Sequence, residues 1–255
     1  ARAQELTELL FRHHHSPWRH RINMLGERKT GWVSQAGWVQ TLYNSFLNPG
    51  LAARSRKGLF AANLSATRGP LEWCRAQQAA FLIFLWRVLE NAVSTCDEPW
   101  ATVLRADQTT EFDIPDRRDP PFAGSNTLLN QEQGVRGFCL AINDLLFESA
   151  ERLKLSEWVQ GAVSIDDTQD EDISDCLASL EKQFCAASIR QTIEALATFD
   201  WRSSDAPELS ENQRLQRASY RGTSGYSRVR LDLLQHIGQS GSPLAQIAEQ
   251  LSNDR

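Results

Sequence analysis

Hydrophobic residues recur at intervals of three and four along most of the chain, the spacing that places them on one face of an α-helix. Alternation with a period of two, which predicts strands, is scarce. The pattern therefore predicts a mainly α protein, an irregular multi-helix bundle with long loops. The expected helices cover residues 1–12, 34–47, 71–93, 99–104, 130–153, 157–163, 173–199, 229–237 and 242–251.

One predicted helix, 71–93, is apolar around most of its circumference, and a helix with that pattern belongs in the interior. Another begins at Ser34, whose hydroxyl suits the N-cap position. Polar stretches separate the helices and predict loops at 51–69 and 105–127 and a linker at 200–212.

The chain of 255 residues is long enough for one large domain or two small ones. We expect a helical core region over residues 1–165 and a C-terminal helical region over 166–255, packed on it as one unit. The first residue is Ala1, inside a predicted helix. We therefore expect that a further domain precedes this chain.

The segment from Arg214 to Ile237 has the features of a binding site. A turn of small residues lies between arginines and feeds an amphipathic helix. Unpaired N–H groups and the helix dipole make such an N-terminus suited to phosphate. The predicted contact residues are Arg214, Arg217, Arg221, Gly222, Gly225, Tyr226, Arg228 and Arg230, with Tyr220 as a further candidate for stacking on a base.

Charge is unevenly distributed although the net charge is only −5. Residues 1–75 carry a net +7, residues 76–212 a net −15 and residues 213–255 a net +3. Basic ends of this kind favour a polyanionic ligand. The sequence therefore predicts that a track of basic residues continues from the Arg-rich segment through Arg19, Arg21, Arg54, Arg56 and Lys57. The alternative is that these arginines neutralise the acidic middle of the same chain.

Metal and catalytic signatures are weak. The histidines His13, His14, His15 and His20 lack a nearby carboxylate or cysteine that would complete a metal site. Asp113, Asp116 and Asp119 do not match a calcium loop. Five cysteines without a CxxC pair favour reduced, mostly buried thiols. No metal site and no cofactor is predicted, and no nucleophilic triad can be assigned.

Residues 166–175 contain six acidic side chains, which leaves a metal-dependent enzyme open as an alternative. Carboxylates ahead of a helix more often interact with its dipole. Whether the chain is an enzyme therefore stays undecided, and we lean towards a chain that carries no activity by itself.

Four segments in this order resemble the C-terminal helical part of DGQHR-domain proteins, a family that includes the DndB-type proteins of DNA phosphorothioation systems. The segments are SPWRHRINMLGE (16–27), VSQAGWVQTL (33–42), NTLLNQEQGVRGFCLAINDLL (126–146) and GTSGYSRVRLDLL (222–234). The DGQHR pentapeptide itself is absent, as expected for a chain downstream of the domain that carries it. The resemblance implies a bacterial DNA-modification or defence setting with DNA as the ligand, and it transfers no catalytic residue.

Three functions follow from these patterns. The first is a nucleic-acid-binding or regulatory domain that contacts DNA phosphates through Arg-rich turns. The second is a protein–protein interaction module of a defence complex, and the third is a metal-dependent nuclease or nucleotidase that uses the acidic cluster. No membrane contact is expected, because no apolar run approaches the roughly 18–20 residues of a membrane span. Reduced, mostly buried cysteines favour a cytoplasmic location.

Overall fold

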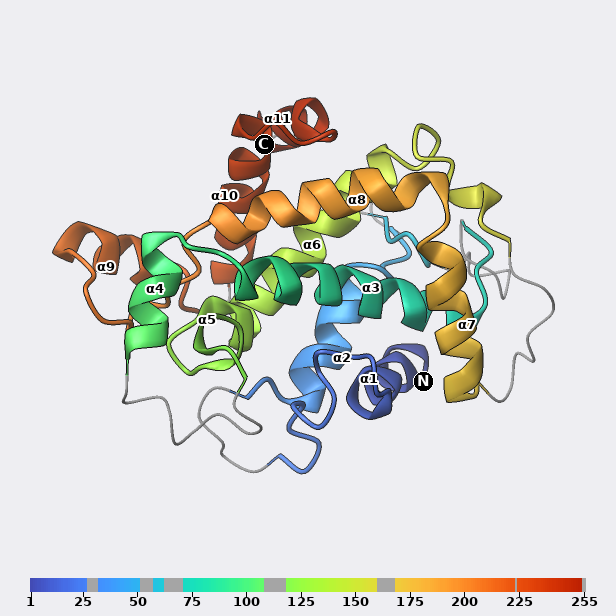
Figure 1. The fold of residues 1–255 in the computed structure, drawn as a ribbon, viewed down its shortest axis with the longest axis horizontal. Helices are drawn as coiled ribbons and strands as arrows, with labels where there is room; N and C mark the ends of the chain where they lie inside the picture. Colours follow the sequence, from blue (N-terminus) through green and yellow to red (C-terminus); the bar gives the residue numbers. More distant parts are fainter. Residues whose placement is uncertain are drawn as a thin grey trace.

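Helices follow one another along the chain in the computed structural model, which describes residues 1–26, 32–50, 57–61, 71–107, 118–159, 168–222 and 224–253 (Figure 1). Within these ranges there is no strand, only two isolated bridges, so the prediction of a mainly α fold is confirmed. The α-helices are α1 (Arg2–Arg12), α2 (Gln35–Asn44), α3 (Arg75–Ser94), α4 (Pro99–Ala106), α5 (Pro120–Ala123), α6 (Glu132–Glu148), α7 (Asp170–Leu180), α8 (Phe184–Glu194), α9 (Glu211–Ala218), α10 (Gly225–Gln239) and α11 (Ala245–Asn253). Short 3₁₀ helices η3 (Leu128–Asn130), η4 (Leu155–Glu157) and η5 (Ala195–Thr198) connect some of them.

Helix α3 is the central helix, as its apolar circumference predicts. It packs against α1, α7 and α8, and α8 runs beside it in the view of Figure 1. The helix begins at Arg75, four residues later than predicted, because Cys74 and Gln77 form a capping box that closes its first turn.

Tryptophans fill the space between α2, α3 and the segment after α1. The ring of Trp18 lies 4.8 Å from that of Trp38 and 5.2 Å from that of Trp86, both edge to face. Phe138 from α6 adds a contact at 4.4 Å to Trp86. Edge-to-face packing of large rings stabilises beyond the area it buries, so this cluster joins the N-terminal segment firmly to the central helices.

The prediction of one continuous helix over 173–199 is wrong. The chain turns after Leu180, and α7, α8 and η5 form three pieces. Both α7 and α8 pack on α3. A straight helix of that length would leave part of its apolar face beyond α3, and the turn lets each piece bury its own face. The short helix predicted over 157–163 is wrong in its described part, because η4 ends at Glu157 and the next two residues are not helical; residues 160–163 lie outside the described ranges.

The polar linker predicted over 200–212 is also wrong. Trp201 is fully buried and donates from its indole nitrogen to the carbonyl of Leu196, at 2.7 Å. A backbone bridge joins Arg202 to Thr127. The segment is therefore a packed part of the fold.

One hydrophobic core runs from the N-terminal to the C-terminal helices, across the predicted boundary at 165/166. Helix α10 packs along α6, and α11 packs on both. Among the described residues no single helix is long and apolar enough to cross a membrane. Helices α3 and α4 reach that length and apolar composition only when they are taken together, and the chain bends by 81° between them.

Candidate functional site

The turn between α9 and α10 brings together the Arg-rich segment that the sequence singles out. Ser210 and Gln213 form a capping box at the start of α9. Gly222 is exposed and has a φ of +88°, a conformation that glycine adopts without steric cost. Gly225 opens α10 where a Cβ atom would lie 1.6 Å from the carbonyl oxygen of Tyr220. Both glycines are thus needed for the shape of the turn.

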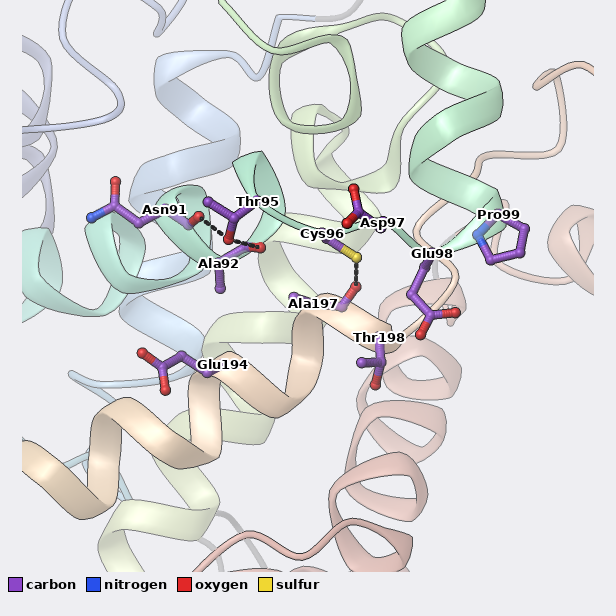
Figure 2. Close-up of a pocket in the computed structure, with 10 residues that line it drawn as sticks. All are labelled: Asn91, Ala92, Thr95, Cys96, Asp97, Glu98, Pro99, Glu194, Ala197 and Thr198. Atoms are coloured by element: carbon purple, nitrogen blue, oxygen red, sulfur yellow. Dashed lines mark hydrogen bonds between the residues drawn. The ribbon is translucent and has the colours of Figure 1, made fainter.

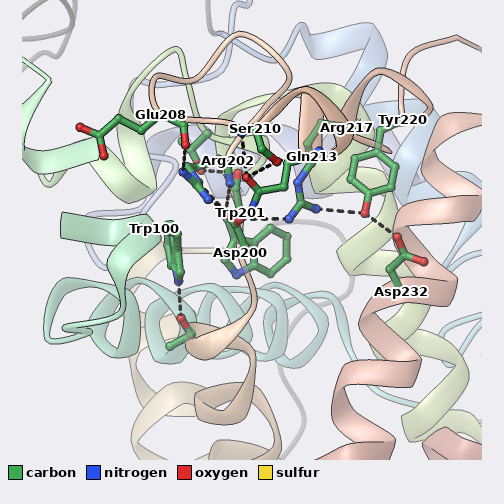
Figure 3. Close-up of polar contacts among 12 residues, drawn as sticks. Trp100, Asp200, Trp201, Arg202, Glu208, Ser210, Gln213, Arg217, Tyr220 and Asp232 are labelled. Atoms are coloured by element: carbon green, nitrogen blue, oxygen red, sulfur yellow. Dashed lines mark hydrogen bonds and ion pairs between the residues drawn. The ribbon is translucent and has the colours of Figure 1, made fainter. Parts of the chain in front are cut away.

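Arg217 points inward and joins a polar network (Figure 3). Its guanidinium lies 3.3 Å from the carboxylate of Asp200 and donates to the hydroxyl of Tyr220 at 3.0 Å. Asp200 also accepts from Arg202, at 2.9 Å, and the Tyr220 hydroxyl donates to Asp232 on α10. The network ties α9 and α10 to the buried segment around Trp201.

The network also perturbs the acid–base properties of its members. Burial acts to raise the pKa of Asp200, but the hydrogen bonds from Arg202 and the charge of Arg217 outweigh it, so the pKa lies below its ordinary value. Burial, aided by the bond to Asp232, raises the pKa of Tyr220 above its usual range. At neutral pH the network therefore holds an ionised aspartate between two arginines and a neutral tyrosine.

Arg230 is also inward-facing. Its side chain is 8% exposed and pairs with Asp144 of α6, which is 6% exposed. One turn earlier, the ring of Tyr226 lies against the guanidinium of Arg136, whose Cζ atom is 4.8 Å from the ring centroid. Tyr226 is half-buried in this contact, so one face of its ring is already occupied.

The remaining arginines of the segment face solvent. Arg214 and Arg228 are exposed, and no ion pair or side-chain hydrogen bond engages either of them within the described ranges. Arg221 pairs with Asp205, but both side chains are more than half exposed, at 61% and 69%. Such a pair contributes only about 0–1 kcal/mol and leaves the guanidinium accessible. Arginines around this turn thus divide into inward members that hold the fold and outward members whose guanidiniums are accessible to solvent.

The predicted basic track divides in the same way. Arg21 is buried between the rings of Trp18 and Phe122, with its Cζ atom 5.1 and 5.2 Å from their centroids. Its guanidinium donates to the side-chain oxygen of Asn130. Burial, together with the nearby charge of Arg118, lowers its pKa to about 9. Arg19 and Lys57 are exposed, whereas Arg54 and Arg56 lie outside the described residues.

The acidic cluster gives little support to a metal site. Asp172 accepts from the backbone N–H of Gln169 in the capping box of α7, and Asp170 pairs with Arg12. In the described part of the chain no group of three or more histidine, cysteine or acidic side chains could hold a metal ion. Asp166 and Asp167 fall outside it. The histidine His13 is buried, and its Nε2 lies 3.1 Å from the carbonyl of Asp170.

A pocket of about 700 Å³ lies where the end of α3, the start of α4 and η5 meet (Figure 2). Its lining contains three carboxylates, Asp97, Glu98 and Glu194, all exposed. Thr198, which also lines the pocket, shares a 2.8 Å hydrogen bond with Nε2 of His236 from α10. Burial lowers the pKa of His236, which keeps it neutral, so the pocket presents mainly negative charge.

Sequence reasoning does not find this pocket, because about 100 residues separate its walls. The segment from Thr95 to Pro99 carries the one available signal, a polar break between two apolar helices. That signal marks a turn, and only the packing of η5 beside it makes a cavity.

Comparison with known proteins adds no relative. The sequence matches no protein-family model, no curated protein and no solved structure.

Proposed function

We propose that this chain is a nucleic-acid-binding module whose phosphate contacts come from the outward arginines around the α9–α10 turn. One observation carries the proposal: Arg217 and Arg230 are fixed in internal ion pairs, while Arg214, Arg221 and Arg228 stay exposed. The buried pairs fix the backbone, and the exposed guanidiniums then need little reorganisation to meet phosphates.

Backbone features of the turn add to this. The first turn of α10 has no side-chain hydrogen bond at its N-cap, Ser224. The helix is 15 residues long, and its dipole places partial positive charge at that end. Gly222 has no atom near the position a Cβ would take, so a phosphate could approach its backbone.

The resemblance to DGQHR-domain proteins supports a DNA ligand, and we propose on that basis a bacterial DNA-modification or defence system in the cytoplasm as the setting. No family model matches the chain, so this setting stays a prediction that rests on the quoted segments. Phosphate contact without base readout predicts binding of modest sequence preference.

A charge-reversal pair tests the proposal. Arg228→Glu is expected to weaken binding of a fluorescent DNA duplex at least tenfold. The binding is measured in about 50–100 mM salt, where the ionic strength is below the physiological value. Lys182→Glu makes the same charge change on an exposed residue between α7 and α8 and should leave binding within about twofold. Equal loss in both variants, or no loss in either, would overturn the assignment of the site.

The acidic pocket favours a second candidate, contact with a basic partner protein. Carboxylates from the segment before α4 and from the end of α8 line a cavity large enough for a lysine or arginine side chain. Replacing Glu98 and Glu194 together by glutamine should abolish capture of an arginine-rich peptide and leave DNA binding unchanged. If the wild-type chain does not bind the peptide at low salt, this candidate fails.

A further inference from the structure

A buried histidine joins the end of α1 to the first turn of α7. The side chain of His13 is fully buried, and its Nε2 lies 3.1 Å from the carbonyl oxygen of Asp170. Its Nδ1 accepts the backbone N–H of His15 at 3.2 Å. The hydroxyl of Ser174 donates to the same Asp170 carbonyl at 3.0 Å and lies 3.4 Å from Nε2. Both ring nitrogens of His13 are thus engaged by backbone groups.

These two contacts fix the position of the proton on the ring. A ring nitrogen that accepts an N–H bond carries no proton of its own. Nδ1 is therefore bare, and the neutral ring keeps its proton on Nε2, where it donates to Asp170. A second proton has to enter at Nδ1, where the N–H of His15 already points. Protonation thus replaces a hydrogen bond by two opposed donors and places a charge on a ring that has no contact with water.

The charged and titratable groups around the ring do little to compensate such a charge. From the same turn, the rings of His14 and His15 lie 4.7 and 5.6 Å away. Within the described ranges, the carboxylate that faces the ring from α7 is that of Asp170, and it is shared with Arg12 from α1, whose Nε is 3.3 Å away. The dipole of α7 adds partial positive charge at this end of the helix. The site therefore favours the neutral imidazole.

We propose that His13 is an acid-sensitive latch, which holds the end of α1 against the first turn of α7 when it is neutral and releases that turn when it is protonated. The other polar contacts that the described residues show across this junction come from Arg12, which donates to the carbonyl of Thr168 at 2.9 Å and pairs with Asp170. The paired side chains are 52% and 46% exposed, and an ion pair so open to water stabilises little. The rest of α7 keeps its packing on α3, so the change is local.

The pH range of the latch follows from proton uptake. Burial lowers the pKa of His13 below its ordinary value of 6.5, and the charges of His14 and His15 act in the same direction, whereas the bond to Asp170 and the charge of Asp170 oppose the shift. The unfolded chain therefore binds this proton more readily than the folded chain. The contribution of His13 to stability is complete above the ordinary value of 6.5 and is lost as the pH falls towards the lower, folded value.

The test is amide hydrogen exchange of the full chain at about pH 7.5 and at about pH 5, on either side of the pKa of a free histidine side chain. Rates are corrected for the intrinsic pH dependence of each amide. The protection of the His15 amide and of the amides in the first turns of α7 should fall severalfold at the lower pH, and that of the α3 amides should not change. The proposal is overturned if α7 keeps its protection in acid, or if α3 loses protection to the same extent.

Two variants show whether His13 is the group that titrates. His13→Gln keeps a side-chain N–H that can donate to Asp170 and takes up no proton in this range, so the protection of α7 should no longer depend on pH. His20→Asn removes an exposed histidine of the same segment, and asparagine tolerates the φ of +56° at that position. This control should lose protection in acid as the wild type does. A pH dependence in His13→Gln equal to that of the wild type would contradict the latch.

A measurement on the wild-type chain decides the matter if His13→Gln does not fold. NMR of the chain with ¹⁵N-labelled histidine should show Nδ1 of His13 bare and Nε2 protonated at neutral pH. The ring should take up its second proton below the ordinary value of 6.5. A proton on Nδ1 at neutral pH, or titration at or above the ordinary value, would overturn the proposal.

Discussion

Arg230 of α10 and Asp144 of α6 form an ion pair with both side chains almost fully buried. Two positions earlier on the same helix, Arg228 is exposed. The two arginines look equivalent in the sequence, yet one holds α10 against α6 and the other faces solvent.

Removal of one partner of a buried pair leaves the other charge without compensation, which costs about 3–5 kcal/mol. Arg230→Ala is therefore expected to lower the free energy of unfolding by that amount in urea titrations. Arg228→Ala should stay within about 0.5 kcal/mol of the wild type, as surface substitutions do. A stable Arg230→Ala variant would show that the pair does not hold the helices together.

The two glycines of the turn should differ in the same assay. In Gly225→Ala the new methyl group meets the carbonyl oxygen of Tyr220, a backbone atom that cannot rotate away. We expect a loss of about 3 kcal/mol, the upper end of the cost of overpacking. Gly222→Ala meets no neighbouring atom and has only its positive φ to accommodate, which costs about 1–2 kcal/mol. An equal loss in the two variants would contradict this packing.

Acid should weaken the network around Asp200. Its pKa is lower in the folded chain than in the unfolded chain, so its contribution to stability is complete above the unfolded value of about 3.9. The contribution is lost as the pH falls through the lower, folded value.

The comparison with Asp200→Asn isolates this effect from other carboxylates. The gap in unfolding free energy between wild type and variant should be widest near pH 7 and should shrink below about pH 4. The measurement is urea unfolding at a series of pH values. A gap that is independent of pH would mean that the charge of Asp200 does not stabilise the fold.

Much of the fold follows from local pattern. The buried face of α3, the N-cap at Ser34 and the final pair α10 and α11 come from residues a few positions apart. The turn after Leu180 does not, because it depends on how α7 and α8 fit against α3. The same reason explains why a tryptophan-containing stretch at 200–212 looks like a linker in the sequence and is packed in the structure.

The sequence predicts which segment forms the candidate site, but it does not predict which of its side chains face solvent. Arginine count and glycine spacing identify residues 214–230, whereas the direction of each arginine depends on distant partners. Asp200 draws Arg217 inward and Asp144 draws Arg230 inward.

The central claim is that the outward arginines neutralise nucleic-acid phosphates, and the salt dependence of affinity tests it most directly. Each phosphate contact on duplex DNA contributes about −0.9 to the slope of log K against log salt concentration. The wild-type chain should bind with a clearly negative slope, measured by fluorescence anisotropy on a 20–30 base-pair duplex at several salt concentrations. In the variant with Arg214, Arg221 and Arg228 all changed to alanine, the slope should be shallower by about 2–3. An affinity that does not change with salt, or the same slope in both proteins, would contradict the proposed function.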